Sequence, residues 1–129
     1  MTKSYNTTRM YRDLKLRAAI ISEKQLILLP GEQIYSKYNG VWNLSADSGN
    51  LGQFVITNVR IVWFASLTES FNVSLPWVAV KLIKIRDSKY GVAIVLETNE
   101  FSGAYVLGFK IENIDQVFEE VSSLFSTFK

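Results

Sequence analysis

Residues 32–109 contain repeated short stretches rich in valine, isoleucine, tyrosine and phenylalanine, each bounded by turn residues. This texture is typical of an all-β sandwich or barrel. The stretch 54–64 is the densest in apolar residues and predicts a central hairpin that turns at Asn58, because asparagine tolerates turn geometry. The predicted strands lie near residues 32–43, 51–57, 60–66, 71–75, 79–86, 91–98 and 103–109.

The last segment changes from a strand period to a helical one. Its apolar residues recur every three or four positions, at Ile114, Val117, Val121, Leu124, Phe125 and Phe128. Asn113 followed by Gln116 fits a capping box that begins the helix. A wide apolar stripe needs an apolar partner, and the open side of a partly closed barrel provides one. We therefore predict a mainly β fold: an antiparallel barrel capped by one C-terminal α-helix.

The N-terminal part predicts a separate connecting segment. Residues 9–21 place Met10, Leu14, Ala18 and Ile21 at helical spacing among basic residues, and Pro30 with Gly31 ends this pattern. Such a helix either lies on an anionic membrane or packs on the domain, and its short apolar face favours packing. We expect a linker with a helix over 1–29 and one domain over 30–129, because 129 residues with 48% apolar content suit a single core.

The residue inventory gives little support to catalysis. The chain has no histidine and no cysteine, so the commonest general base, metal ligand and thiol nucleophile are missing. The pair Glu119 and Glu120 is expected on the solvated face of the last helix. Neither the phosphate-loop pattern nor the calcium-loop pattern is completed around residues 47–52. We predict no enzyme, no cofactor and no metal site; the net charge of +2 also argues against nucleic-acid binding.

One basic cluster has two interpretations of equal weight. Lys81, Lys84, Arg86 and Lys89 follow a predicted strand into a turn, and the spacing of two puts Lys84 and Arg86 on one strand face. Together these bases could hold an anionic head group. Alternatively, lysines on an exposed strand discourage pairing with other chains.

Two tryptophans lead to different expectations. Trp63 lies in the densest apolar strand and is expected in the core. Trp77 follows Pro76 and is expected to be half-exposed at a turn, where it would contact a membrane or a protein partner.

Several long blocks closely resemble the second half of the Bardet–Biedl syndrome 5 family: residues 10–17, 39–45, 49–52, 56–63, 70–74, 83–89 and 103–111. The resemblance implies a pleckstrin-homology-like (PH-like) barrel of seven strands with a C-terminal helix. It also implies a subunit of the BBSome, the coat-like complex that carries membrane proteins into and out of cilia, with other subunits and phosphoinositide-containing membranes as partners. The implied location is cytoplasmic, at the ciliary membrane and basal body.

The chain differs from lipid-binding PH domains at the rim where phosphates usually bind. Lys37 and Arg60 could contribute there, but the loop 45–50 has no base. Glu69 and Glu100, in the third and sixth loops, would repel phosphate. A lipid site is therefore expected at Lys84, Arg86 and Lys89 instead. The alternative is a protein-binding scaffold domain without lipid contact.

Overall fold

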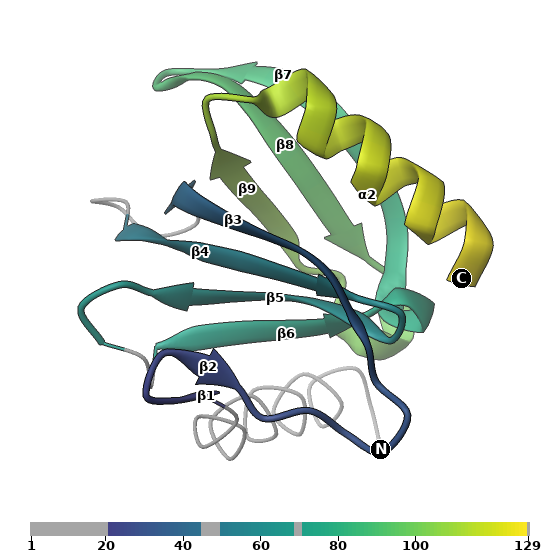
Figure 1. Ribbon diagram of the computed structural model, residues 1–129. Coiled ribbons are helices and arrows are strands. Elements are labelled where there is room, and N and C mark those ends of the chain that lie inside the picture. The colour runs from purple at the N-terminus through teal and green to yellow at the C-terminus, as the bar shows by residue number, and fades with distance from the viewer. Residues whose placement is uncertain (1–20, 45–49, 69–70, 129) are drawn as a thin grey trace.

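The computed structural model describes residues 21–44, 50–68 and 71–128. Seven antiparallel strands form one sheet in the order β6-β5-β4-β3-β9-β8-β7, as Figure 1 shows. The strands are β3 (Ile34–Asn43), β4 (Asn50–Thr57), β5 (Arg60–Ala65), β6 (Asn72–Pro76), β7 (Val80–Ser88), β8 (Gly91–Thr98) and β9 (Val106–Lys110). Two short 3₁₀ helices, η2 (Trp77–Ala79) and η3 (Glu100–Ser102), precede β7 and β9. The predicted strands and the fold class are confirmed, with shifts of only a few residues at their ends.

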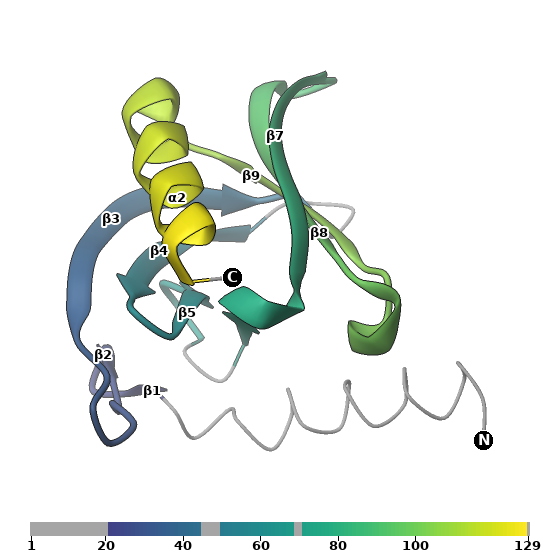
Figure 2. The ribbon, with the colours of Figure 1, turned by 90° about the vertical axis from the view of Figure 1, so that its right-hand side faces the viewer.

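Strand β3 joins the two halves of the sheet. Most of its length pairs with β4, whereas its last residues, Trp42 and Asn43, also pair with Lys110 and Phe109 of β9. Within the described residues β6 and β7 are the two edges of the sheet. Helix α2 (Ile114–Phe128) lies between β3 and β7, which Figure 2 shows from the side. The sheet is therefore rolled and its open side is covered by the predicted C-terminal helix.

The core lies between the rolled sheet and α2. Its fully buried side chains include Trp63, Phe54 and Phe109, and the rings of Phe54 and Phe109 meet edge to face at 4.8 Å. From α2, Val117 and Val121 are completely buried. The expected burial of Trp63 is confirmed, and its indole Nε1 donates a hydrogen bond to the carbonyl of Val41 at 3.0 Å.

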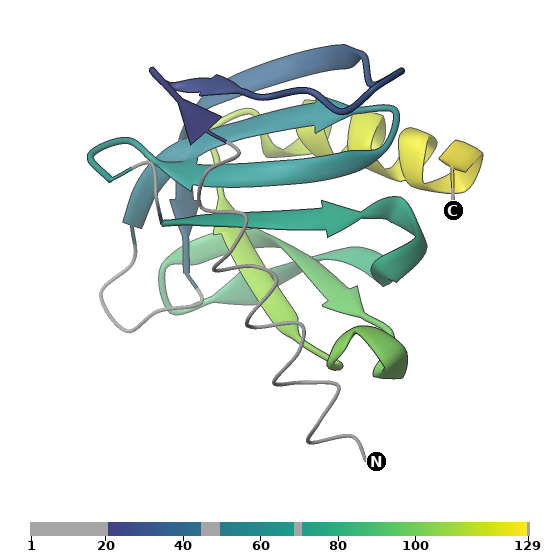
Figure 3. The same cartoon turned by 90° about the horizontal axis from the view of Figure 1, so that it is seen from below.

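A second, smaller apolar cluster lies on the outer face of the sheet. The hairpin of β1 (Ile21–Ser22) and β2 (Gln25–Leu26) packs Ile21 and Leu26 against Val55, Val62 and Phe64. In Figure 3 this purple hairpin lies next to β3 and β4. Part of the segment predicted as a linker thus contributes to the domain's packing. The predicted helix over 9–21 falls almost wholly on residues outside the described ranges.

Helix α2 is held to β3 by polar contacts as well as by its apolar stripe. Ser36 and Tyr38 both donate hydrogen bonds to the carboxylate of Glu120. Burial of Tyr38 raises the pKa of its phenol, and the hydrogen bond to Glu120 adds to that effect. The prediction that Glu120 is solvated is wrong, because the half-buried carboxylate fastens the helix to the sheet.

Gly52 allows the Trp63 ring to lie close against strand β4. A Cβ at position 52 would lie 2.2 Å from the carbonyl oxygen of Phe64 and 2.6 Å from the Trp63 ring. Gly52→Ala is therefore expected to lower the free energy of unfolding by about 1–3 kcal/mol, the usual cost of overpacking a core. Urea denaturation checks this value. Gly108→Ala is the control, since its new Cβ meets only Leu44 at 3.9 Å; equal losses in both variants would contradict the packing argument.

Candidate functional site

The basic cluster lies on the exposed edge strand β7. Lys84 and Arg86 are directly opposite Val95 and Ala93 of β8, so both project from the outer face, while Ile83 packs against the core from the other side. Arg86 is exposed and Lys89 is exposed in the turn that follows. The spacing of two along a regular strand therefore brings two bases together, next to a third at the turn.

One of these bases already has an intramolecular partner. The ammonium of Lys84 lies 2.7 Å from the carboxylate of Glu97 on β8. This hydrogen bond lowers the pKa of Glu97, against the opposing effect of desolvation, and the charges of Lys84, Lys81 and Arg86 lower it further. Three bases of the cluster therefore stabilise the charged form of Glu97, although Lys84 is the one that forms the ion pair with it.

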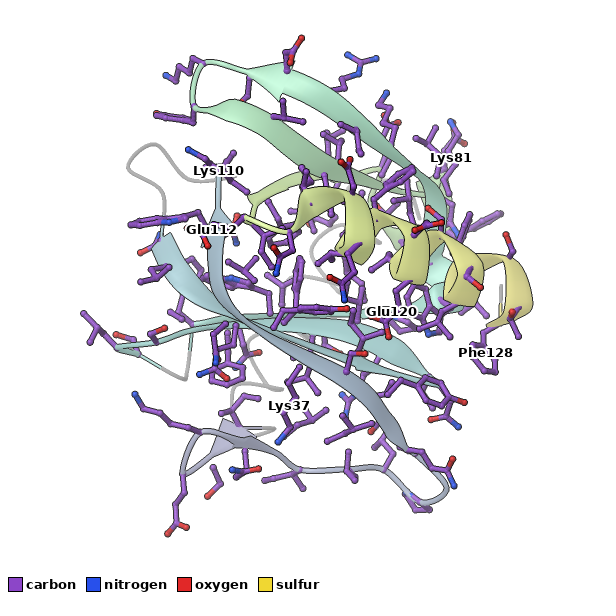
Figure 4. The ribbon with its side chains drawn as sticks, turned by 45° about the horizontal axis from the view of Figure 1, so that its top comes forward. Lys37, Lys81, Lys110, Glu112, Glu120 and Phe128 are labelled. Atoms are coloured by element: carbon purple, nitrogen blue, oxygen red, sulfur yellow. The ribbon has the colours of Figure 1, made fainter. Side chains whose placement is uncertain are left out.

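The β7–β8 turn adds a base that the sequence did not reveal. A Cβ on Gly91 would lie only 3.8 Å from the ammonium nitrogen of Lys110, so this lysine of β9 reaches the turn. The ammonium of Lys89 lies 5.2 Å from the centre of the Tyr90 ring. We call Lys84, Arg86, Lys89 and Lys110 the basic strip. Figure 4 shows Lys110 beside the turn, with Lys81 at the opposite end of β7.

Two residues expected at a ligand site are buried instead. Arg60 is 2% exposed, and its guanidinium lies 2.8 Å from the carboxylate of Glu32. Trp77 is 1% exposed, and its Nε1 donates to the carbonyl of Thr57 at 3.0 Å. The prediction of Arg60 at a phosphate rim is wrong because its charge is neutralised inside the fold. The prediction of a half-exposed Trp77 is wrong because η2 turns its ring into the core.

Lys37 remains on the surface, on β3. Its ammonium donates a hydrogen bond to Gln25 of β2 at 3.3 Å, and Figure 4 labels both Lys37 and Lys110. The two lysines line one cavity from different strands, β3 and β9. The loop 45–49 and Glu69 lie outside the described residues, so the acidic rim stays a prediction. Glu100, the other acidic position, is exposed at the start of η3.

A cavity of about 540 Å³ opens between β3 and the connection from β9 to α2. Its lining is Lys37, Tyr38, Asn39, Gly40, Trp42, Lys110, Ile111, Glu112 and Asn113. Glu112 is the single carboxylate in this lining, so the cavity lacks the two converging acids of carboxylate-based hydrolysis. Within the described residues no cluster of three potential metal ligands occurs. No helix in that same part of the chain is long and apolar enough to cross a bilayer.

One family model matches nearly the whole chain. Residues 15–129 match the family model described as the Bardet-Biedl syndrome 5 protein second PH-like domain. The "BBSome complex member BBS5" of Danio rerio is 58% identical over 127 residues, and that of Homo sapiens 57%. The Caenorhabditis elegans "BBSome complex member bbs-5" is 47% identical over 128 residues, which cover 96% of this chain and 36% of that protein.

The vertebrate matches cover 98% of this chain but only 37% of each relative, so the chain spans little more than a third of their length. Among solved structures, the "Vps36 N-terminal PH domain" superposes with a TM-score of 0.67 at 12% identity, covering 84% of this chain and 91% of that one. The C-terminal domain of a protein from Leishmania infantum superposes with a TM-score of 0.61 at 18% identity, covering 92% and 96%. These two likenesses show the PH-like fold alone.

Proposed function

This chain belongs to the Bardet–Biedl syndrome 5 family, in the position of its second PH-like domain, and on that premise we propose that it is a non-enzymatic adaptor domain of a BBSome subunit. Its partners are then the other BBSome subunits, and its task is the trafficking of ciliary membrane proteins from the cytoplasmic side. The observation that carries this proposal is identity of 57–58% along 98% of the chain to proteins named as BBSome complex members.

We further propose that the basic strip contacts an anionic membrane that contains phosphoinositides. Arg86 and Lys89 are exposed, and Lys110 brings a third base to the same turn. Bases near an anionic leaflet each contribute about 1 kcal/mol of binding free energy. Several bases on one exposed edge therefore supply enough attraction for peripheral, salt-sensitive binding.

The charge-reversal variant Lys84→Glu/Arg86→Glu/Lys89→Glu tests the membrane contact. Loss of three favourable bases is expected to weaken binding to phosphoinositide-containing vesicles about 100-fold, at about 1 kcal/mol per base. Vesicle sedimentation at two salt concentrations measures this, and circular dichroism checks the fold. Weaker binding of the unmodified protein at the higher salt concentration is part of the expected result.

The control is Lys24→Glu, which reverses a lysine charge on the β1–β2 hairpin, outside the basic strip, and is expected to retain vesicle binding. Unchanged binding of the triple variant would reject the basic strip as the lipid site.

A protein-binding scaffold without lipid contact is the second candidate function. It is favoured by one observation: Lys84 is already paired with Glu97, so part of the basic charge on β7 is neutralised within the domain. The scaffold function would leave the unmodified domain without vesicle binding. It also requires an exposed apolar surface for the partner.

A further inference from the structure

Three of the four most exposed large apolar side chains in the described residues come from one corner of the fold. Phe101 on η3 is 88% exposed, Val78 on η2 is 73% exposed, and Val106 at the start of β9 is 62% exposed. The fourth, Leu67, is 97% exposed and belongs to the β5–β6 connection. Single exposed apolar residues are ordinary, whereas a cluster of them marks an interaction site. We call Val78, Phe101 and Val106 the apolar corner.

The turns that carry the apolar corner are tied together through Asn99. Its backbone N–H donates to the carbonyl of Ala79 at 2.9 Å, and its side-chain nitrogen donates to the carbonyl of Val78 at 3.0 Å. Its side-chain oxygen in turn accepts from the N–H of Ser102 at 2.9 Å, which closes η3. Figure 2 shows this turn projecting beyond the sheet at the lower right.

The backbone adopts positive φ angles at two successive residues to make this turn. Gly103 has φ +99°, and Ala104 has φ +52°, a left-handed conformation that costs free energy for any residue with a Cβ. The hydrogen bonds of Asn99 hold the turn in that shape. The backbone that carries Phe101 is thus held in one conformation, and a partner would lose little backbone entropy in binding it.

The charges around the apolar corner nearly cancel. Lys81 and Glu100 have opposite signs and are both exposed, and Lys84 is paired with Glu97. An anionic membrane surface attracts regions with an excess of bases, which this corner lacks. An apolar centre with a mixed polar rim is instead the usual arrangement of a protein–protein interface.

We propose that the apolar corner docks onto another subunit of the complex, with Phe101 entering an apolar pocket of that subunit. This inference rests on the proposed function, since it assigns the surface through which the adaptor domain joins its complex. The membrane contact and the subunit contact then centre on different parts of the domain: the bases at the β7–β8 turn for lipid, and the corner formed by η2, η3 and β9 for protein. The Lys84–Glu97 pair lies between them, with Glu97 opposite Val106.

The test uses the full-length protein that contains this domain, co-expressed with the other BBSome subunits. A photo-reactive amino acid at position 101 is expected to crosslink to another subunit in the purified complex. Phe101→Ser is expected to weaken association with that subunit by roughly tenfold or more, as for a buried aromatic hot spot. Its melting temperature is expected to stay unchanged, because the side chain is 88% exposed.

Two controls separate the corner from the rest of the surface. Leu67→Ser removes an even more exposed apolar side chain elsewhere and is expected to leave association unchanged. A photo-reactive residue in place of Glu119 on the exposed face of α2 should give no crosslink to the same subunit.

Crosslinks from position 101 to lipid or to a second copy, or full association of Phe101→Ser, would overturn the docking surface alone. Failure of the unmodified protein to co-purify with the other subunits would overturn the proposed function as well.

Discussion

Arg60→Leu is expected to lower the free energy of unfolding by about 3–5 kcal/mol, because it leaves a buried carboxylate without its partner. The guanidinium of Arg60 grips Glu32 through two hydrogen bonds of 2.8 Å, from Nε and from one terminal nitrogen. The two side chains are 3% and 0% exposed, so water cannot replace the lost contact. Urea denaturation followed by circular dichroism measures the loss.

The loss in Arg60→Leu is also expected to depend on pH. Burial alone raises the pKa of Glu32, but hydrogen bonds from Arg60, the N–H of Leu29 and Thr57, together with the charge of Arg60, bring it below its ordinary value of 4.5. A carboxyl with a lowered folded pKa stabilises the protein above its unfolded pKa, and that contribution is lost as the pH falls through the folded pKa. The wild-type protein therefore loses stability in acid through Glu32.

In the variant, only the hydrogen bonds from Leu29 and Thr57, each weaker than the one from Arg60, still oppose the effect of burial on the pKa of Glu32. Protonation of Glu32 then removes the unpaired buried charge. The difference in unfolding free energy between wild type and Arg60→Leu is thus expected to shrink as the pH falls below 4.5. Lys84→Leu breaks the pair with Glu97, whose side chains are 30% and 23% exposed against 3% and 0% for Arg60 and Glu32. It is the control and is expected to change stability much less. A difference that stays constant with pH would contradict the account of the Arg60–Glu32 pair.

The strands and the final helix could be predicted because each depends on residues that are close together in the sequence. The dense apolar residues on both sides of Asn58 and the turn preference of asparagine specify the β4–β5 hairpin. The Asn58 side chain accepts from the N–H of Gln33 at 2.8 Å. The three-and-four spacing of Val117 and Val121 likewise marks the helix face that is buried in the core.

Contacts between distant segments could not be predicted in the same way. Arg60 and Glu32 are 28 positions apart, and nothing local distinguishes an arginine that pairs inside the fold from one that faces a ligand. Lys110 joins the basic strip only because β9 runs beside β8. The β1–β2 hairpin has two residues in each strand, too few to show any alternation.

The exposure of Trp77 could not be predicted from its place at a turn, because the direction of the turn was unknown. Pro76 correctly marks the end of β6, but the following residues form η2, whose hydrogen bond from the N–H of Trp77 to the carbonyl of Val59 directs the ring inward. A residue at a turn is exposed only if the turn points outward, and local sequence does not determine that direction.

Trp77→Ala is expected to lower the free energy of unfolding by about 3–5 kcal/mol, the range for removing a large buried aromatic ring. The indole is among the largest fully buried side chains, and its loss leaves a cavity where η2 meets α2. It also removes the hydrogen bond to the carbonyl of Thr57. Urea denaturation with a far-ultraviolet circular dichroism signal measures the loss without relying on tryptophan fluorescence.

Trp77→Phe separates the cavity from the hydrogen bond. This variant keeps an aromatic ring but cannot donate to Thr57, so a loss of roughly 1–3 kcal/mol is expected, the usual cost of a buried group left unpaired. Trp42→Ala is the exposed counterpart, because Trp42 is 44% exposed against 1% for Trp77, and a much smaller loss is expected. A membrane-contacting Trp77 would give the opposite order, with unfolding unchanged and vesicle binding reduced, so measuring both quantities on the same variants decides between a core residue and a contact residue.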